Sequence, residues 1–356
     1  MSRLGCGIVG CGGAAADMCR AIDRLPETYV AAVHDRVAGR AAELGSAHGA
    51  AVHASLDELL RDPLVDVVYV ALPHYLLAPT AEAALGAGKH VLVEKPMALD
   101  VAAIASLRRL ADDARLKIAP VFELRASSVF REARRLVAAG AIGDVRAVRI
   151  RTVIDKHAAY WQSGPRGLVR DGWRARRAEA GGGVVLMNSI HQLDLTRYVT
   201  GLSFVRALAE LATSYADVEV EDSAAAVLRL SNGALGTLVA AAHSPGATHE
   251  ERIELDGSAG RLDLPDPSGP DAACVRVFLT RPWNDLAAGR WLELETARND
   301  AYLDLLRDFV AAVERGSALP ATADDAAAAL ATVLAVYDAA ASGGAVDVEQ
   351  PASPVA

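Results

Sequence analysis

Residues Leu4 to Ala15 read Leu-Gly-Cys-Gly-Ile-Val-Gly-Cys-Gly-Gly-Ala-Ala, and this stretch decides the fold. Its first half, Leu4 to Val9, is a continuous apolar run of the kind that forms a buried parallel strand. A glycine-rich turn follows and leads into a segment that predicts a helix through Arg24. A strand, a glycine-rich turn and a helix in this order open the dinucleotide-binding half of a doubly wound α/β fold.

The turn itself fits the dinucleotide fingerprint with alanine in the third place. Gly10 makes the tight turn, Gly12 lets the backbone approach a pyrophosphate, and Ala15 allows the helix to pack closely on the strand. The free N–H groups at the start of a helix form an anion site, which adds Gly13 and Ala14 to the expected cofactor contacts.

The second predicted strand, Tyr29 to His34, ends at an acid. Asp35 lies 35 − 10 = 25 residues after Gly10, close to where a carboxylate binds the ribose hydroxyls of adenosine, so it favours NAD. Arg36 keeps NADP open, because a guanidinium there can hold a 2′-phosphate or stack on the adenine. A cap for the next helix is the structural alternative for Asp35.

A β-then-α rhythm continues to residue 122 and predicts a parallel sheet with helices on both faces. Leu72, Pro73 and His74 stand at the end of one of the apolar strands, so we expect them near the cofactor. The expected strands are Val65–Leu72, a strand ending at Lys95, and Ile118–Phe122; the expected helices are Ala38–Gly49, Ser55–Arg61 with a capping box to Glu58, Thr80–Ala87, and Asp100–Arg115.

The run Gly-Lys-His-Val-Leu-Val-Glu-Lys-Pro, Gly88 to Pro96, is a short apolar strand that ends in an acid and a base. Open α/β sheets bind their ligands at the carboxyl edge, so we expect Glu94 and Lys95 at the mouth of a crevice. The ammonium of Lys95 can donate a proton to a ligand oxygen or stabilise negative charge there. A surface lysine in a strand-to-helix loop is the alternative.

Beyond residue 122 the pattern changes to consecutive strands. We expect an α+β domain over 123–348 for substrate binding and oligomerisation, and a tail over 349–356. Its mostly antiparallel sheet would place one face on helices and leave the other free for a partner subunit. The expected elements are helices Val129–Ala139, Asp300–Arg315 and Thr322–Ser342, strand Asp144–Ile154, and a hairpin of Ala224–Leu230 with Leu235–Ala242 around Asn232-Gly233.

A glycine triplet, residues 181–183, precedes Val-Val-Leu-Met-Asn-Ser-Ile-His, which ends at His191. If a helix begins here, Asn188 and His191 share a face, and the glycines let its first turn approach a bound cofactor. When a secondary alcohol loses hydride, an imidazole near neutral pKa can take the hydroxyl proton, typically a gain of about 10² to 10⁴ in rate. A structural histidine in a domain interface is the alternative.

Three motifs in this order, the glycine-rich start, the Glu94-Lys95-Pro96 strand end and the triplet leading to His191, resemble the Gfo/Idh/MocA family of sugar and cyclitol oxidoreductases. The resemblance covers nearly the whole chain. It implies that Lys95 and His191 flank the substrate carbinol as catalytic residues. It also implies an arginine just after the first domain, here Arg125, with a substrate-binding or domain-orienting use.

The sequence departs from the family pattern at three positions. His74 stands where the family usually has asparagine, Leu77 where it has histidine, and Met187 where it has aspartate. Methionine cannot relay a proton, so the lysine, aspartate and histidine triad of the family is incomplete. Asn188 can orient a substrate hydroxyl without titrating.

A segment rich in aromatic and polar residues lies between 156 and 177. Tyr160, Trp161 and Arg174 offer aromatic faces beside a guanidinium, which suits the apolar faces and hydroxyl rim of a carbohydrate. Ordinary domain packing is the alternative for these residues.

Composition limits the classes of partner. With 356 residues, 52% hydrophobic and net charge −9, the chain predicts two globular domains and no general attraction to nucleic acid or anionic membranes. No apolar run reaches the roughly 20 residues of a membrane span, although Ala326–Tyr337 comes closest. The four cysteines lack metal-ligand spacing, and the start of the chain carries no leader pattern, so we expect no metal and a cytoplasmic protein.

These observations predict an NAD-dependent oxidoreductase, with NADP still open, that transfers hydride to or from a CH–OH group of a sugar, sugar derivative or cyclitol. It would assemble as a homodimer or homotetramer through the C-terminal sheet. Two alternatives remain: a glycosidase that uses bound NAD for transient oxidation, and a non-catalytic dinucleotide-sensing regulator.

Overall fold

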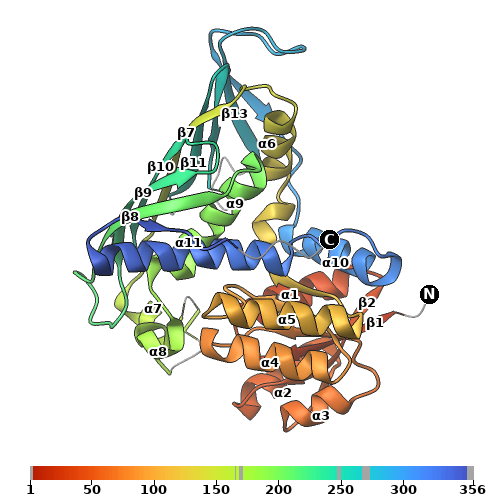
Figure 1. Ribbon diagram of the computed structural model, residues 1–356. Coiled ribbons are helices and arrows are strands. Elements are labelled where there is room, and N and C mark those ends of the chain that lie inside the picture. Colours follow the sequence, from red (N-terminus) through yellow and green to blue (C-terminus); the bar gives the residue numbers. More distant parts are fainter. Residues whose placement is uncertain (1–2, 165, 168–170, 247–249, 267–272, 351–356) are drawn as a thin grey trace.

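The computed structural model describes residues 3–164, 166–167, 171–246, 250–266 and 273–350. It contains two β-sheets at opposite ends of the molecule, and the long helix α11 (Ala323–Ser342) runs between them (Figure 1). The tail expected over 349–356 falls mostly outside the described residues.

The first sheet has six parallel strands in the order β3-β2-β1-β4-β5-β6. This is the doubly wound order, in which the direction of strand addition reverses between β1 and β4 and opens a crevice at the carboxyl edge. Four of its strands are almost wholly buried apolar runs, as expected of a sheet covered on both faces. The strands are β1 (Leu4–Val9), β2 (Thr28–His34), β3 (Ala51–Val52), β4 (Val67–Val70), β5 (His90–Glu94) and β6 (Ile118–Val121).

The helices of this half are α1 (Gly13–Arg24), α2 (Ala38–His48), α3 (Leu56–Arg61), α4 (His74–Gly86) and α5 (Val101–Ala114). Ser55 and Asp100 cap α3 and α5 as predicted. The predicted start of α4 at Thr80 is wrong, because Pro79 lies inside the helix rather than before it. Pro79 cannot donate a backbone hydrogen bond within the helix. The helix includes it because Leu77, on the core side, is fully buried there.

Helix α10 (Ala301–Arg315) returns from the end of the chain to the first sheet. Its Leu305 and Phe309 are fully buried in one core cluster with Ile8 and Met18. The run of parallel strands therefore ends near residue 122, but the hydrophobic core of the first half does not. Helix α10, which begins 301 − 121 = 180 residues after the last of these strands, completes that core.

The second sheet has nine strands in the order β14-β13-β12-β11-β7-β10-β9-β8-β15. It is mostly antiparallel as predicted, and the hairpin at Asn232-Gly233 pairs β9 with β10. The exception is the parallel pair of β7 and β10. The strands are β7 (Val145–Val153), β8 (Phe204–Ala212), β9 (Ser223–Leu230), β10 (Leu235–Ala241), β11 (Glu250–Gly257), β12 (Gly260–Leu264), β13 (Cys274–Leu279), β14 (Trp291–Glu295) and β15 (Val346–Asp347).

One face of this sheet packs on helices α6 (Ser128–Ala138), α9 (Ile190–Thr200) and α11 (Figure 1). The strands β8, β9 and β10 alternate buried and exposed residues, so their second face is open in this chain. An antiparallel sheet with one covered and one open face has this alternation.

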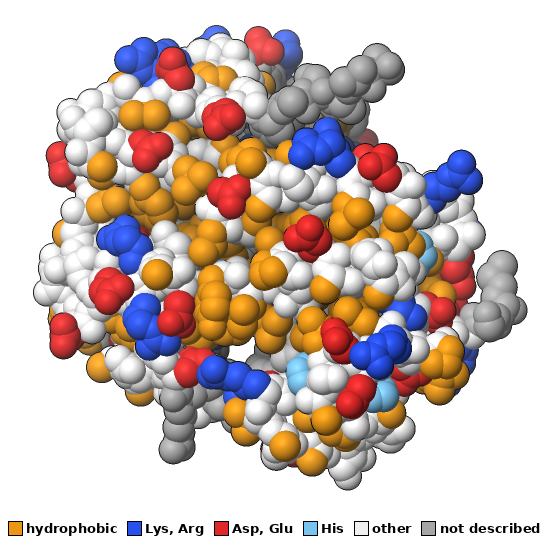
Figure 2. Space-filling view, turned by 60° about the horizontal axis from the view of Figure 1, so that its bottom comes forward, with side chains coloured by type: hydrophobic (Ala, Val, Ile, Leu, Met, Phe, Trp, Pro, Cys, Tyr) orange, Lys and Arg blue, Asp and Glu red, His pale blue; other side chains and the backbone are white. Residues whose placement is uncertain are grey.

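Among the described residues, α11 is the one helix long and apolar enough to cross a membrane by length and composition. In the fold it packs against β8 and α5, and Leu330, Val333 and Val336 are fully buried. Its apolar side chains thus belong to the core that joins the two halves. On the face drawn in Figure 2, acidic and basic side chains lie interspersed among apolar ones rather than gathered in a field of one sign.

Candidate active site

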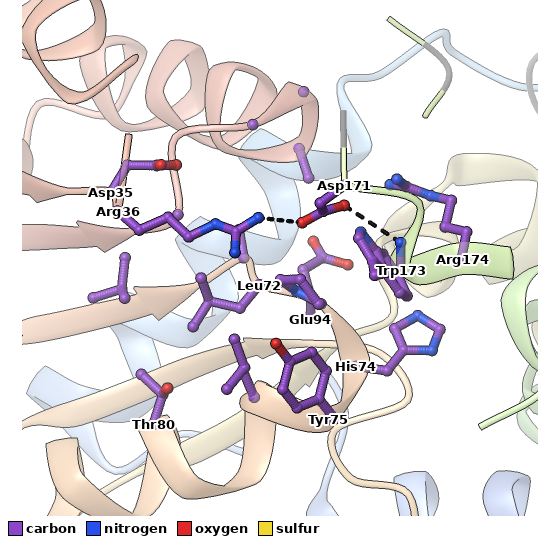
Figure 3. A pocket seen from close by; sticks show the side chains of 18 of the residues that line it. Asp35, Arg36, Leu72, His74, Tyr75, Thr80, Glu94, Asp171, Trp173 and Arg174 are labelled. Carbon is purple, nitrogen blue, oxygen red and sulfur yellow. Dashed lines mark hydrogen bonds and ion pairs between the residues drawn. The ribbon is translucent and has the colours of Figure 1, made fainter. Parts of the chain in front are cut away.

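A cavity of about 450 Å³ lies between the carboxyl edge of the first sheet and the segment of residues 156–188 (Figure 3). Most of the side chains predicted for a cofactor or substrate line it. These are Gly10, Gly12, Gly13, Ala14, Asp35, Arg36, Leu72, Pro73, His74, Glu94, Lys95, Tyr160, Arg174 and Asn188.

The glycine-rich turn has the geometry that the fingerprint requires. Gly10 has φ +91°, and a Cβ atom there would lie 2.3 Å from the carbonyl oxygen of Ala71. Gly12 is the N-cap of α1 and makes no side-chain capping bond, which leaves the N–H groups of the first turn open to an anion. Ala15 is fully buried against the strand, so its role is packing rather than ligand contact.

Asp35 connects the turn to β2. One carboxylate oxygen accepts a 2.9 Å hydrogen bond from the Cys11 N–H, and the other accepts a 2.8 Å bond from the Val37 N–H. The N-cap of α2 is Val37, so the capping alternative for Asp35 is not realised. The carboxylate stays in the cavity wall at the place expected for a ribose partner.

Arg36 reaches across the crevice and forms an ion pair with Asp171, as Figure 3 shows. Asp171 also accepts a hydrogen bond from the backbone N–H of Trp173. Asp171 was not predicted as a site residue, because nothing local in the sequence signals a contact between residues 135 positions apart.

His74 is buried at the start of α4. Its Nδ1 lies 2.7 Å from the carbonyl oxygen of Ala180, so Nδ1 carries the hydrogen, and its ring meets the Trp173 ring edge-on at 4.7 Å. Burial, with the nearby charge of Lys95, lowers the pKa of His74 to about 3. The imidazole is therefore neutral at ordinary pH.

Glu94 and Lys95 leave the end of β5 in different directions. The Tyr69 hydroxyl donates a 2.6 Å hydrogen bond to Glu94, and burial raises the pKa of this carboxyl group. The Nζ of Lys95 crosses the crevice and donates a 2.6 Å hydrogen bond to the carbonyl oxygen of Met187 in η3 (Val185–Ser189), a π-helical turn. Lys95 thus stands at the crevice mouth, as predicted from the strand end.

The glycine triplet does not line the cavity, and contacts within the protein require its glycines. A Cβ atom at Gly182 would lie 2.0 Å from the Tyr337 hydroxyl, and one at Gly183 would lie 1.8 Å from the carbonyl oxygen of Glu221. The Glu221 carboxylate accepts hydrogen bonds from the N–H groups of Gly183 (2.7 Å) and Val185 (3.0 Å). This buried acid fixes the start of the segment that carries Met187.

His191 lies beside the cavity without lining it. Its Nδ1 is buried with no hydrogen-bond partner among the described residues, and its ring meets Phe122 edge-on at 6.0 Å. Burial, followed by the positive charge of Lys95, lowers the pKa of His191 well below the usual value. Asn188 does line the cavity, and it lies in the π turn rather than in the α-helix on which the predicted spacing was based.

Tyr160, on the short helix α7 (Ala158–Ser163), is surrounded by cations. The Lys156 Nζ lies 4.0 Å from its ring centre, and the Arg174 guanidinium carbon lies 5.4 Å away. Burial alone would raise the pKa of Tyr160, but the charges of Lys156, Arg174 and Lys95 outweigh it and lower the pKa. The hydroxyl points to the Met187 sulfur at 3.6 Å, a weak acceptor. Lys156 also lines the cavity and was not predicted.

Two predicted substrate contacts lie elsewhere. Arg125 is buried in a bidentate ion pair with Asp194 (2.7 and 2.5 Å) and a second pair with Asp325 (3.0 Å), which joins η1 (Glu123–Ala126) to α9 and α11. All three nitrogen atoms of its guanidinium group donate to these carboxylates, an arrangement that suits the domain-orienting use. Trp161 is 2% exposed and packs in the core instead of the cavity wall.

The chain matches two family models. Residues 4–122 match "Oxidoreductase family, NAD-binding Rossmann fold", and residues 130–263 match "GFO/IDH/MocA C-terminal domain".

Individual proteins match over most of the chain. The 1,5-anhydro-D-fructose reductase of Ensifer adhaerens is 32% identical over 298 residues, which cover 83% of each protein. Inositol 2-dehydrogenase of Rhizobium meliloti (strain 1021) is 25% identical and covers 91% of this chain and 93% of its own. GenD2 from gentamicin A biosynthesis, solved in complex with NAD, is 27% identical with a TM-score of 0.83, covering 98% of this chain and 97% of its own.

Proposed function

Because this chain belongs to the Gfo/Idh/MocA family of NAD-binding oxidoreductases, we propose that it transfers hydride between NAD and a secondary alcohol or ketone of a sugar, sugar derivative or cyclitol. The observation that carries the proposal is the position of Lys95. Its ammonium lies in the wall of the cavity that begins at the glycine-rich turn, and its charge acts on both His191 and Tyr160.

The lining residues fit a dinucleotide. The uncapped first turn of α1 suits a pyrophosphate, the Asp35 carboxylate suits ribose hydroxyls, and the segment Leu72–His74 forms an apolar wall at the crevice. Arg166 lies at the same helix start, where it donates to the Gly13 carbonyl oxygen and forms an ion pair with Asp17. A bound nicotinamide ring would supply the hydride acceptor or donor.

The protein's own groups handle the oxygen and its proton. Lys95 has three N–H donors and uses one on the Met187 carbonyl, so it can also hold the substrate oxygen and stabilise charge on it. His191 is neutral and lies beside the cavity with its Nδ1 unpaired among the described residues, and we propose that it receives the hydroxyl proton during oxidation. Asn188 in the cavity wall can orient a neighbouring hydroxyl.

The proposed assembly is a homodimer through the open face of the nine-stranded sheet. Leu208 and Val227 face each other in register on β8 and β9, and Val239 lies on β10; each of the three is nearly half exposed. An apolar patch on a sheet face of this kind supports burial against a second copy. Val227→Asp should convert the dimer to monomers in light scattering coupled to size exclusion, and a dimer that persists would contradict this assembly.

The direct test is a screen of sugars and inositols with NAD and NADP, read at the nicotinamide absorbance. Net NADH formation with at least one of them supports the dehydrogenase. Hydrolysis of a glycoside with no net NADH would indicate the transient-oxidation glycosidase, and tight NAD binding with no turnover would indicate a regulator. The cytoplasmic location and the lack of a nucleic-acid or membrane partner stay predictions, which fractionation of the producing cells tests.

A further inference from the structure

Three cationic side chains meet at one end of the cavity. Lys156 comes from the segment after β7, Arg174 from η2 (Trp173–Ala175), and Lys95 from the end of β5. All three are partly buried, and all three act electrostatically on the Tyr160 phenol between them. This group is called the cation cluster below.

Within the described parts of the chain, no member of the cation cluster forms an ion pair with a carboxylate. Lys95 bonds a neutral carbonyl oxygen, Lys156 lies over the Tyr160 ring, and Arg174 lies over the Tyr160 and Trp173 rings. Most other arginines of the structure pair with an acid; Arg176, two residues further on, pairs with Glu179 at 2.7 Å. The three side chains of the cation cluster thus differ from most arginines of the structure in having no carboxylate of the described residues in an ion pair with them.

The neighbouring polar groups do not supply a compensating negative charge. Met187 presents a neutral thioether, and Asn188 is neutral as well. Glu94, in the same cavity wall beside Lys95, accepts a hydrogen bond from the Tyr69 hydroxyl (2.6 Å), and burial raises the pKa of its carboxyl group. Glu251 bonds to Gln192 (3.0 Å). Burial, followed by the charge of Asp266, raises the pKa of Glu251 to about 7 even though Lys156 and Lys95 lower it. Asp171, in the same cavity wall, is already paired with Arg36.

Three like charges in a partly desolvated cavity repel one another, and an anionic ligand removes this repulsion. Arginine and lysine side chains bind carboxylates through charge-assisted hydrogen bonds, and these are stronger than bonds to neutral hydroxyls. We therefore propose that the substrate is a polyhydroxy carboxylic acid, such as a uronate or an aldonate, whose carboxylate binds Lys156 and Arg174 while its reacting hydroxyl lies at Lys95. This rests on the proposed dehydrogenase function.

The test compares acids with matched neutral compounds. Wild-type enzyme with NAD is assayed on D-glucuronate and D-galacturonate, on their amides, on the parent sugars and on the sugar 6-phosphates. The amide keeps the size of the acid and removes its charge. We expect kcat/KM for an acid to exceed that for its amide by at least about tenfold, as for a hydrogen bond to a charged group. Binding to the NAD-loaded enzyme is followed in parallel by tryptophan fluorescence, because Trp173 contacts Arg174.

Variants locate the effect. Lys156→Met should lower the preference for the acid about tenfold, Lys156→Arg should keep most of it, and Arg131→Met, an exposed site outside the cavity, should leave it unchanged.

Equal kcat/KM and equal binding for acid and amide, or a preference for the 6-phosphates, would overturn the carboxylate proposal. If neutral sugars yield NADH equally well, the carboxylate proposal fails and the dehydrogenase function stands. If acids bind selectively but no compound yields NADH, the anion site stands and the proposed oxidation fails. Absence of binding by every acid would also contradict the proposal.

Discussion

The Lys95 ammonium and the Met187 carbonyl oxygen are joined by a 2.6 Å hydrogen bond that spans the crevice from β5 to η3. The Met187 side chain cannot accept a strong hydrogen bond, and the lysine is held by the Met187 backbone instead. The Glu221 carboxylate fixes the start of η3, so this carbonyl oxygen has a defined place. Lys95 is therefore positioned by the fold itself.

Removing the acid that pairs with Arg36 should relax the cofactor preference. Asp171→Asn frees the Arg36 guanidinium and removes a negative charge that repels a 2′-phosphate. We expect the ratio of kcat/KM with NADP to kcat/KM with NAD to rise by about tenfold. Asp171→Glu, which keeps the charge, serves as the control, and an unchanged ratio in Asp171→Asn would show that this ion pair has no part in cofactor choice.

The buried ion pair of Arg125 should be a stability element. Arg125→Met leaves Asp194, which is 1% exposed, without its bidentate partner. The free energy of unfolding should fall by about 3–5 kcal/mol in denaturant titrations, because a buried charge is left uncompensated. The matched control is Arg131→Met, whose pair with Asp308 is exposed and contributes at most about 1 kcal/mol. Losses of the same size in both variants would argue against this role.

Acid should destabilise the protein partly through His74. Its pKa is lowered from 6.5 to about 3 in the folded state, so the unfolded state binds a proton first as pH falls. The stabilisation is complete above the unfolded pKa and is lost progressively from 6.5 down to about 3. Between about pH 7 and about pH 5 the loss of folding free energy from this histidine is about 2 kcal/mol.

His74→Asn keeps a donor for the Ala180 carbonyl and does not titrate. Thermal unfolding of this variant should therefore depend less on pH over that range than unfolding of the wild type. Parallel curves for the two proteins would rule out His74 as a source of the acid sensitivity.

The parts that follow local rules were predictable from the sequence. Continuous apolar runs located the parallel strands, the glycine-rich turn located the crevice, and the end of the β5 run placed Lys95 at its mouth. Asp171 and Lys156 were not found, because their place in the cavity depends on how the second half folds over the first. The π turn at η3 was likewise not predicted, because the sequence pattern there indicated an ordinary α-helix.

Packing also decided residues whose type alone was ambiguous. Arg125 and Trp161 carry groups that suit a carbohydrate, but buried partners occupy them. Gly182 and Gly183 are required by close contacts with Tyr337 and Glu221, which come from distant segments. The residue type shows which ligands a side chain could bind. Only the tertiary contacts show whether that side chain is available to a ligand.

The central claim is that Lys95 holds the reacting oxygen while NAD lies in the adjacent crevice. It is tested by comparing wild type, Lys95→Met and the remote control Lys117→Met for turnover of the best substrate in the screen and for NAD binding by fluorescence. We predict that Lys95→Met lowers kcat by about 10² to 10⁴ while NAD still binds, and that Lys117→Met changes neither quantity. Wild-type turnover by Lys95→Met would contradict the account.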